Sequence, residues 1–416
     1  METKMNVARR VPDEKKVLDI DLYGEVKRWP YPYYEVWAST PPFYIMSDGY
    51  PQAVCTKFDD TRAVLQDFGR FSSEKQPYPG TQGFYFFNAL PTVTDSDPPN
   101  HTRRRRFMAP AFTPRRLVSL EVQIGEVVDR VLDRVAQGGD TIDYVRDIAK
   151  PVALHTLLTL VCGISEDAWP VMTDLVAAQR RAFSELAGKG QQDAGYQQAW
   201  ERAREYCGKI IEERRANPIE DDLVSGLVMD VGAEGKITNE ELFATLFILY
   251  VAGIGGLTTF PSWLLWRLTR HPDQMTLLQA HPELLQGAMT ESLRMEPSSF
   301  ASIRYATADF TFQGLEITKG MPVHTLSASG NYDPVRFPDP LRFDIARPGS
   351  WQNLTSFGHG AHHCIGNTLA RLTTRICVAK TLARFPGISA VDPEARPPIE
   401  GVLKNRALGA LPLRLE

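Results

Sequence analysis

Hydrophobic residues recur with helical spacing over most of the chain and alternate, as in strands, in two short regions. From about Arg115 to Arg270 the apolar positions follow helical periodicity almost throughout. Alternation at 43–46 and 53–56, around a Ser-Asp-Gly turn, predicts an early hairpin, and a second β-rich stretch is predicted at 302–323 around a Gln-Gly turn. The pattern therefore predicts a mainly α fold with small β-sheets.

The longest apolar run, Glu241 to Leu268, predicts a long buried helix. Glycines at 253, 255 and 256 each cost roughly 1 kcal/mol relative to alanine inside a helix, and Pro261 removes a backbone donor. We therefore expect a kink or a widened turn here. Two interpretations of the glycines remain open, either close packing against a neighbouring helix or bare backbone facing a pocket.

Composition indicates a large globular protein. The chain has 416 residues, of which 43% are hydrophobic and 23% charged. Such a length would ordinarily suggest two or three domains of about 100–200 residues, but no linker, repeat or change in composition marks a boundary. The net charge of −4 predicts no general affinity for nucleic acid.

The start of the chain, residues 1–16, is polar and charged, and so predicts neither a secretory signal nor a membrane anchor. Five cysteines at scattered spacings are typical of reduced thiols rather than of a disulfide framework. We expect a soluble, cytoplasmic protein without a membrane partner.

The candidate chemistry lies in the segment 357–366, Phe-Gly-His-Gly-Ala-His-His-Cys-Ile-Gly, just before a helix-patterned run. Its glycines allow backbone N–H groups to approach the sulfur of Cys364, which helps to hold a thiolate beside a metal. A solitary thiolate in such a loop can ligate haem iron. The alternatives are a small buried hydrophobe, or a zinc site with the neighbouring histidines, but a second ligand-bearing segment is missing.

The loop resembles the cysteine-loop signature of the cytochrome P450 family, Phe-Gly-x-Gly-x-His-x-Cys-x-Gly, and meets every fixed position. Residues 291–294, Glu-Ser-Leu-Arg, resemble the family's Glu-x-x-Arg helix, and residues 337–343 resemble the segment between that helix and the loop. The resemblance implies a single haem domain over residues 1–416. The implied fold is a triangular, prism-like helical architecture with haem between the long distal helix and the helix after the cysteine loop.

The same resemblance assigns roles to individual residues. Cys364 would be the axial ligand of the iron of heme b (iron protoporphyrin IX), and the groups carried over as propionate contacts are His101, Arg105, Arg304 and His362. Glu291 and Arg294 would form a fold-locking pair, with Arg342 or Arg347 as a third partner. An ordinary surface salt bridge is the alternative for that pair. The other arginines of the basic run, at 103, 104 and 106, would be surface charge or dock a ferredoxin.

The predicted long helix resembles the family's distal helix, which usually carries Ala/Gly-Gly-x-Asp/Glu-Thr. An ungapped match from His271-Pro272 places Gly255 and Gly256 at the acid and alcohol positions, and we favour it. A shifted register would instead use Thr258 and Thr259, which restores the alcohol but not the acid. Protons for oxygen cleavage would then come from ordered water or the substrate, or hydrogen peroxide would bring its own.

Substrate contacts are expected from three regions. The aromatic cluster in a Gly/Pro-bounded loop includes Phe84, Tyr85 and Phe87. The distal helix would add Ile248, Val251 and Ala252, and the segment after Pro297 would add Ser299 and Phe300. Residues 404–405 near the end of the chain either meet a polar substrate group or form an exposed turn. This lining predicts a small hydrophobic, aromatic substrate, although aromatic clusters more often form a core.

The resemblance implies a haem-thiolate monooxygenase that hydroxylates its substrate or removes an O-alkyl group oxidatively. Electrons would come from a separate ferredoxin and an NAD(P)H-dependent ferredoxin reductase, and the protein would be a monomer. Three alternatives remain open: a peroxygenase driven by hydrogen peroxide, a haem isomerase or dehydratase that does not use oxygen, and a non-catalytic haem-binding protein.

Overall fold

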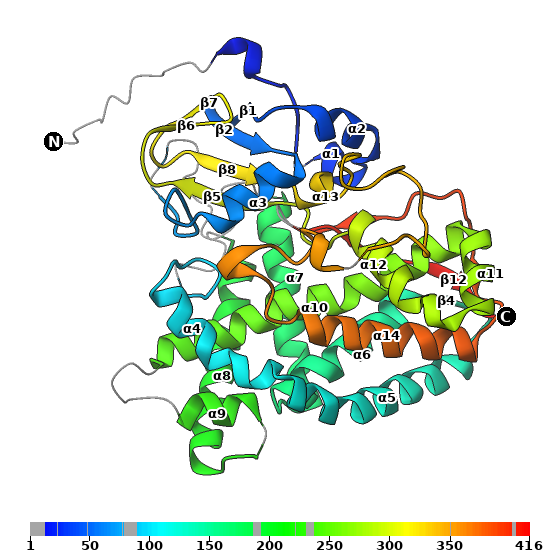
Figure 1. Cartoon of the computed structure of the whole chain (residues 1–416). Helices are drawn as coiled ribbons and strands as arrows, with labels where there is room; N and C mark the ends of the chain where they lie inside the picture. The colour runs from blue at the N-terminus through cyan, green and yellow to red at the C-terminus, as the bar shows by residue number, and fades with distance from the viewer. Residues whose placement is uncertain are drawn as a thin grey trace.

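The computed structural model describes residues 13–22, 24–47, 49–76, 78, 90–185, 193–220, 222–229, 237–349, 351–401 and 405–416. A helical body carries small sheets, with the largest sheet at one end (Figure 1). The mainly α fold with small sheets that the sequence predicts is thus confirmed.

The α-helices surround one long central helix, α10. Their bounds are α1 Glu25–Arg28, α2 Tyr31–Ser39, α3 Phe58–Gln66, α4 Asn100–Met108, α5 Pro114–Ala136, α6 Lys150–Leu154, α7 Trp169–Glu185, α8 Ala194–Ala216, α9 Leu223–Met229, α10 Asn239–Arg270, α11 Pro272–Ala280, α12 Leu285–Met295, α13 Ser327–Gly330 and α14 Asn367–Arg384. Shorter helical turns are η1 Glu14–Lys16, η2 Ala109–Phe112, η3 Val145–Ala149, η4 His155–Val161, η5 Glu166–Ala168, η7 Pro282–Leu284, η8 Trp351–Asn353 and η9 Gly360–His362.

The largest sheet joins strands from distant parts of the chain. The strands of all the described sheets are β1 Phe43–Ser47, β2 Tyr50–Cys55, β3 Phe71–Ser72, β4 Thr141–Asp143, β5 Ser302–Ala306, β6 Phe310–Phe312, β7 Leu315–Ile317, β8 Pro322–Thr325, β9 Ser389–Ala390, β10 Ile399–Glu400, β11 Ala407–Leu408 and β12 Pro412–Arg414. The five-stranded order is β1-β2-β8-β5-β3, in which β2 and β8 pair in parallel and the other neighbours are antiparallel. Figure 1 shows these blue and yellow strands together. Both predicted β regions therefore form. Strands β5 and β8 of the second region join the early hairpin in one sheet, whereas β6 and β7, on either side of the Gln-Gly turn, form a separate two-stranded sheet.

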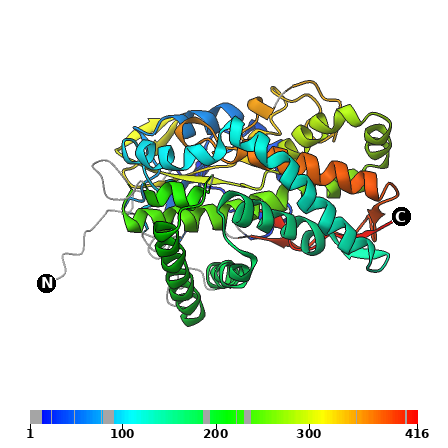
Figure 2. The ribbon, with the colours of Figure 1, turned by 90° about the horizontal axis from the view of Figure 1, so that it is seen from below.

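Local sequence explains where the helices that position the site begin. The Thr238 hydroxyl accepts the Glu241 N–H while the Glu241 carboxylate accepts the Thr238 N–H, which is a capping box at the start of α10. Helix α14 begins at Asn367, directly after the cysteine loop. Both views show α14 and α5 running side by side, and α14 also packs on α10 (Figures 1 and 2).

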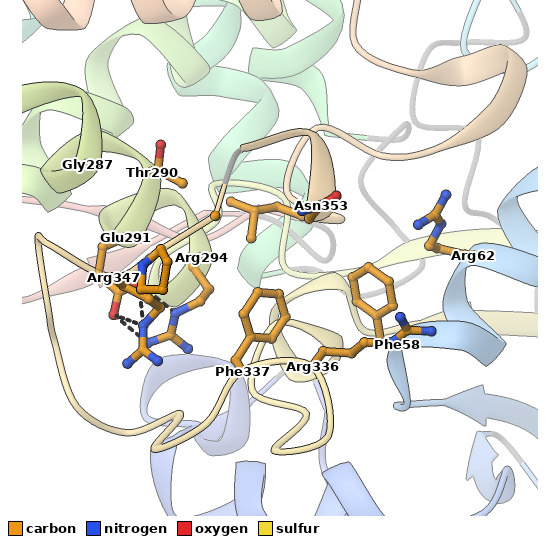
Figure 3. Close-up of a pocket in the computed structure, with 13 residues that line it drawn as sticks. Phe58, Arg62, Gly287, Thr290, Glu291, Arg294, Arg336, Phe337, Arg347 and Asn353 are labelled. Atoms are coloured by element: carbon orange, nitrogen blue, oxygen red, sulfur yellow. Dashed lines mark hydrogen bonds and ion pairs between the residues drawn. The ribbon is translucent and has the colours of Figure 1, made fainter.

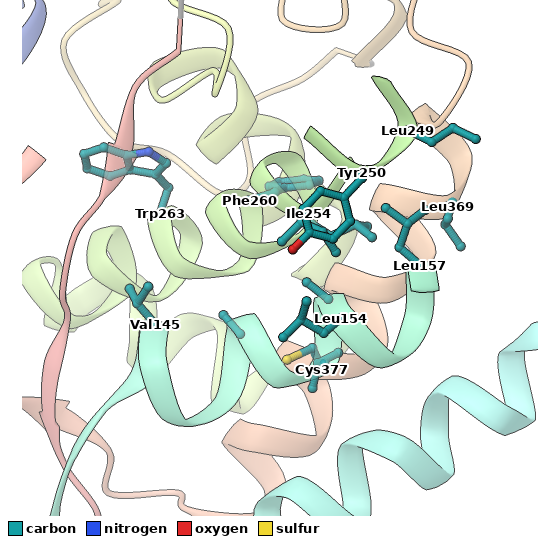
Figure 4. Close-up of a cluster of buried hydrophobic side chains, with 14 of the residues drawn as sticks. Val145, Leu154, Leu157, Leu249, Tyr250, Ile254, Phe260, Trp263, Leu369 and Cys377 are labelled. Atoms are coloured by element: carbon teal, nitrogen blue, oxygen red, sulfur yellow. The ribbon is translucent and has the colours of Figure 1, made fainter. Parts of the chain in front are cut away.

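The core lies where α10 meets α6 and α14. Tyr250 and Ile254 of α10 face Leu154 and Leu157 of α6 and η4, with Cys377 of α14 close by (Figure 4). These side chains are all buried. Burial of one apolar face fixes the rotation of α10, and so decides which of its residues point the other way.

Helix α10 is also long and apolar enough to cross a membrane, with a mean hydropathy of 1.8 over its most apolar window. Because 67% of that window is buried inside the protein, α10 is accounted for as a core helix. It is α-helical from end to end through Pro261, so of the expected kink or widened turn, the widened turn is wrong for this helix. Widened turns occur instead in its neighbours η3 and η4.

Candidate active site

The cysteine loop is closed by its own backbone and packed against α3. Gly358 and Gly360 have φ values of 72° and 71°, in the left-handed region that favours glycine. A β-carbon on Gly360 would lie 2.8 Å from the Leu65 carbonyl oxygen of α3. The Cys364 N–H donates to the Phe357 carbonyl at 2.8 Å. The glycines are therefore needed for the shape of the loop.

Cys364 differs from the other cysteines in its surroundings. It is exposed, whereas the remaining four are buried. Burial among surrounding protein atoms nevertheless raises the pKa of its thiol, while the N–H groups of Gly366 and Asn367 and the charge of Arg105 act to lower it. An accessible sulfur that protein still surrounds faces an interior space. The backbone donors that a thiolate requires are in place around it.

Basic side chains from α4, β5 and the cysteine loop meet beside Cys364. The rings of His101 and His362 are 4.1 Å apart between centroids, and Arg105 and Arg304 act electrostatically on both. Burial lowers the pKa of each of the two arginines. Within the described part of the chain, both ring nitrogens of buried His101 lack a hydrogen-bond partner. The four residues predicted to hold propionates are thus brought together.

His362 is held neutral at this position. Burial, followed by the charges of Arg304, His101 and Arg105, lowers its pKa to about 3. Its Nε2 lies 2.9 Å from the Ser73 hydroxyl, and the Ser73 N–H donates to the Asp97 carboxylate at 2.9 Å. The imidazole therefore acts here through hydrogen bonding rather than as a cation.

This set of donors fits haem. Two guanidinium groups and an imidazole with unpartnered nitrogens are suited to the two carboxylates of a porphyrin, because buried polar groups require hydrogen-bond partners. The accessible thiol beside them is suited to the iron. The zinc alternative finds no support, since the described residues contain no group of three or more His, Cys, Asp or Glu able to hold a metal ion.

The glycines of α10 fall into two groups, one that allows close packing and one that leaves bare backbone beside open space. A β-carbon on Gly253 would lie 2.4 Å from Leu157 Cδ2, so Gly253 allows close packing. At Gly255 and Gly256 an added β-carbon would meet nothing within 4 Å. Ala252, one turn before Gly256, is exposed although most of the helix is buried. This face of α10 therefore borders open space with bare backbone.

The two threonines of the alternative register differ from these glycines in their surroundings. Thr259 is buried, and the buried Thr258 hydroxyl has no hydrogen-bond partner among the described residues. The Thr258 carbonyl accepts from the Ser262 hydroxyl at 2.7 Å. Gly255 and Gly256 thus have open space beside them, whereas Thr259 lies within packed protein.

Glu291 and Arg294 form a bidentate ion pair in α12. Arg294 Nε and Nη2 each donate to a Glu291 oxygen at 2.8 Å, and both side chains are almost completely buried. Arg347 Nε donates to the same carboxylate at 3.0 and 3.1 Å. Arg342 contributes its carbonyl oxygen to both arginines. The third charged partner is therefore Arg347.

The residues expected to contact the substrate differ in their exposure to the open side of α10. Phe84, Tyr85 and Phe87 lie outside the described residues. On α10, Val251 is half-buried and Ala252 exposed on the open side, and Ile248 is buried.

The other two expected substrate contacts, Ser299 and Phe300, lie after α12. Phe300 is fully buried in the main hydrophobic core, which favours a packing role, and Ser299 pairs through its backbone with exposed Asn405.

Sequence reasoning missed several residues at the site. Ser73 contacts His362, and Phe112 lies 3.9 Å from where a β-carbon of Gly366 would be. Arg103 and Arg104 do not point freely to solvent as expected, because both donate to Glu241 of α10. None of these contacts follows from a local motif, because each joins residues that lie far apart in the sequence.

Comparisons with known proteins agree with this arrangement. A family model described as Cytochrome P450 matches residues 278–407. The chain is 33% identical over 345 residues to mycinamicin IV hydroxylase/epoxidase of Micromonospora griseorubida, covering 82% of this chain and 84% of that protein. It is also 33% identical over 390 residues to cytochrome P450 monooxygenase PikC of Streptomyces venezuelae, covering 90% and 88%.

Solved structures give the same result. P450BioI, in complex with an acyl carrier protein ligated to hexadec-9Z-enoic acid, superposes with a TM-score of 0.83 at 29% identity, covering 94% of this chain and 99% of that one. The cytochrome P450 PksS of the Bacillus subtilis 168 bacillaene polyketide synthase superposes with a TM-score of 0.82 at 27% identity, covering 94% and 98%.

Proposed function

The chain belongs to the cytochrome P450 family, and we propose that it is a monooxygenase that inserts one oxygen atom from O2 into an apolar substrate. The cofactor of the family is heme b, which supplies oxygen activation at its iron when bound. The observation that carries the proposal is the convergence of the Cys364 thiol with four basic side chains on one interior space.

Each of these residues has a definite task in the proposal. Cys364 would ligate the iron, with the N–H groups of Gly366 and Asn367 stabilising its thiolate. Arg105, Arg304 and His101 would bind the propionates, and His362 would complete that contact. Glu291, Arg294 and Arg347 would hold the segment that leads to the loop in register.

The open face of α10 supports the ungapped register, with Gly255 at the acid position and Gly256 at the alcohol position. Neither glycine can hold or move a proton. We therefore propose that protons reach the reacting centre from ordered water or from a polar group of the substrate. The same observation favours a second candidate function, a peroxygenase, since hydrogen peroxide brings its own protons.

The substrate is proposed only as apolar. The small aromatic molecule expected from the sequence depends largely on Phe84, Tyr85 and Phe87, which lie outside the described residues. Relatives carry other names, such as 6-deoxyerythronolide B hydroxylase and biotin biosynthesis cytochrome P450. A binding screen should therefore include fatty acids and macrolides beside aromatic ethers and phenols, with the low-spin to high-spin Soret shift as the readout.

Electron supply by a separate ferredoxin and an NAD(P)H-dependent reductase is part of the proposal, as are a cytoplasmic location and a monomeric state. Arg106, which is exposed on α4, remains a candidate docking charge for an acidic ferredoxin. Arg103 and Arg104 are less suitable, because Glu241 already binds them.

The decisive experiment uses the holoprotein with ferredoxin, reductase, NAD(P)H and isotope-labelled O2. One labelled oxygen atom in the product is expected for a monooxygenase. Product formed from hydrogen peroxide alone at a matching rate would instead establish the peroxygenase. Product formed without oxygen or reductant would establish an isomerase or dehydratase, and both outcomes contradict the monooxygenase.

A further inference from the structure

The ion pair of α12 has a further contact, with the residue that follows α13. Figure 3 shows Arg294 bound to the Glu291 carboxylate on the lining of a pocket. A third nitrogen of that guanidinium, Nη1, donates to the backbone carbonyl of Asn331 at 3.0 Å. Arg294 and Asn331 are 1% and 0% exposed. Asn331 therefore accepts a charged hydrogen bond in the interior, which fixes its backbone relative to α12.

The side chain of Asn331 binds the two residues that lead into the cysteine loop. Its Oδ1 accepts the Thr355 N–H at 3.0 Å, and its Nδ2 donates to the Ser356 hydroxyl at 2.8 Å. Thr355 and Ser356 are both buried. The Ser356 hydroxyl in turn donates to the Leu293 carbonyl of α12 at 2.6 Å. One amide group therefore ties residues 355 and 356 to α12 and α13.

These hydrogen bonds require both a donor and an acceptor at position 331. The Ser356 hydroxyl has a single proton, which it donates to the Leu293 carbonyl, so it must accept from Asn331. The Thr355 N–H needs an acceptor at the same side chain. An aspartate would supply the acceptor but not the donor, and would bury a charge. An amide of this size satisfies both neighbours at once.

The residues that Asn331 holds are followed directly by the backbone contacts that close the cysteine loop. The Thr355 carbonyl accepts the Gly358 N–H at 2.9 Å. Phe357, the next residue after Ser356, accepts the Cys364 N–H at 2.8 Å through its carbonyl. A displacement of residues 355 and 356 would therefore move the acceptor that holds the backbone of Cys364.

We propose that Asn331 is a positioning residue for the haem ligand and acts through Thr355 and Ser356 on the cysteine loop. This inference rests on the proposed function, because it takes Cys364 to be the ligand of the iron. A ligand is held in its productive geometry by the hydrogen bonds of the residues around it. Loss of the Asn331 amide should therefore favour haem without a thiolate ligand.

The carbon monoxide difference spectrum of the reduced holoprotein tests this role. It gives the ratio of the long-wavelength thiolate band to the shorter-wavelength band of haem without a thiolate. Asn331→Ala should lower that ratio about tenfold or more, because the buried Thr355 N–H loses its acceptor and Ser356 loses its donor. Asn331→Asp should also lower the ratio, since it keeps the acceptor but removes the donor.

Ser356→Ala tests whether Asn331 acts through its partner. It removes the hydroxyl that links the Asn331 amide to the Leu293 carbonyl. The effects of Asn331→Ala and Ser356→Ala on the logarithm of the band ratio should be less than additive in the double variant. Fully additive effects would contradict a role of Asn331 through Ser356.

Asp143→Ala is the control for a general loss of stability. The Asp143 carboxylate accepts the N–H groups of Val145 and Leu411 at 3.1 and 2.9 Å, beside a sheet that contains no part of the cysteine loop. This substitution should lower the unfolding midpoint measured by circular dichroism and leave the band ratio unchanged. An equal fall in the ratio for Asp143→Ala would show that ligation follows stability alone, and would overturn the positioning role.

The remaining outcomes separate this inference from the proposed function. Should Asn331→Ala lose haem, Asn331→Asp and Ser356→Ala provide the test. A thiolate band that is present in the wild type and unchanged in these variants would overturn the positioning role alone. Absence of the band from the wild type would overturn the assignment of Cys364 as the ligand, and the inference with it.

Discussion

The Glu241 carboxylate at the start of α10 accepts a hydrogen bond from Arg103 of α4, with 3.0 Å between Arg103 Nη1 and Glu241 Oε2. Arg104 binds the same carboxylate, also at 3.0 Å. Helix α4 carries His101 and Arg105 toward the site, and α10 carries the open glycine face. One buried carboxylate therefore fixes the helix of the basic cluster against the helix of the open glycine face.

Glu241→Gln is expected to destabilise the protein at neutral pH. Burial alone would raise the pKa of Glu241, but the hydrogen bonds from Arg103, the Thr238 N–H and Arg104 hold it at about 2. Relative to the ordinary value of 4.5, this lowering corresponds to about 3 kcal/mol of stability. Urea unfolding followed at the Soret band and by circular dichroism measures the difference between wild type and variant.

The pH dependence of this difference has a defined sign. A lowered pKa stabilises the folded state fully above the unfolded value of 4.5, and the contribution is lost as the pH falls toward about 2. The advantage of the wild type over Glu241→Gln should therefore stay constant from pH 7 to about 5 and shrink below about 4.5. A difference that already narrows near pH 6 would contradict the assigned role.

Gly256→Ala and Gly253→Ala form a matched pair on α10. At Gly256 the added methyl group meets nothing within 4 Å, so the helix should gain up to about 1 kcal/mol of stability. At Gly253 it would lie 2.4 Å from Leu157 Cδ2, and overpacking of about 1–3 kcal/mol should cancel or exceed that gain. The unfolding midpoints of the two variants measure these changes in stability. Equal changes in midpoint for Gly256→Ala and Gly253→Ala would argue against the open face.

Gly256→Thr tests the register of the distal helix. If Gly256 occupies the alcohol position, an added hydroxyl should raise the fraction of NAD(P)H that ends in product rather than in free peroxide. Thr259→Ala should leave that fraction unchanged. The opposite result, in which only Thr259→Ala alters the coupling, would favour the register that uses Thr258 and Thr259.

Glu291→Gln should be among the most damaging substitutions outside the haem contacts. It leaves Arg294, which is 1% exposed, and Arg347 without their carboxylate. Removing one partner of a buried ion pair typically costs about 3–5 kcal/mol. Glu121→Gln is the control, because its exposed pair with Arg375 should contribute less than about 1 kcal/mol. Similar haem incorporation by the two variants would contradict a fold-locking role.

The sequence was sufficient to predict features that residues close together in the chain form. The cysteine loop and the Glu291–Arg294 pair each lie within one short segment of the sequence. The hairpin of β1 and β2 follows from alternating apolar and polar residues on either side of a turn. Contacts between distant segments could not be predicted. Nothing in the run of arginines at 103–106 indicates Glu241, more than 130 residues later, and Ser73 gives no sign of its contact with His362.

The glycines of α10 illustrate the same limit. Sequence alone allowed either packing or an open face, and the structure assigns packing to Gly253 and the open face to Gly255 and Gly256. The distinction depends on Leu157 of η4, which faces one side of α10 only. A kink or a widened turn was expected from these glycines together with Pro261. The widened turn does not form in α10, which remains α-helical with its long apolar face packed on several helices.

The carbon monoxide difference spectrum of the reduced protein tests the central assignment, that Cys364 is the thiolate ligand of the haem iron. Wild-type protein should show the long-wavelength Soret band that a thiolate ligand gives. Cys364→Ala should lose that band, whereas Cys377→Ala, which changes a buried cysteine of α14, should keep it. Retention of the thiolate band by Cys364→Ala would contradict the account.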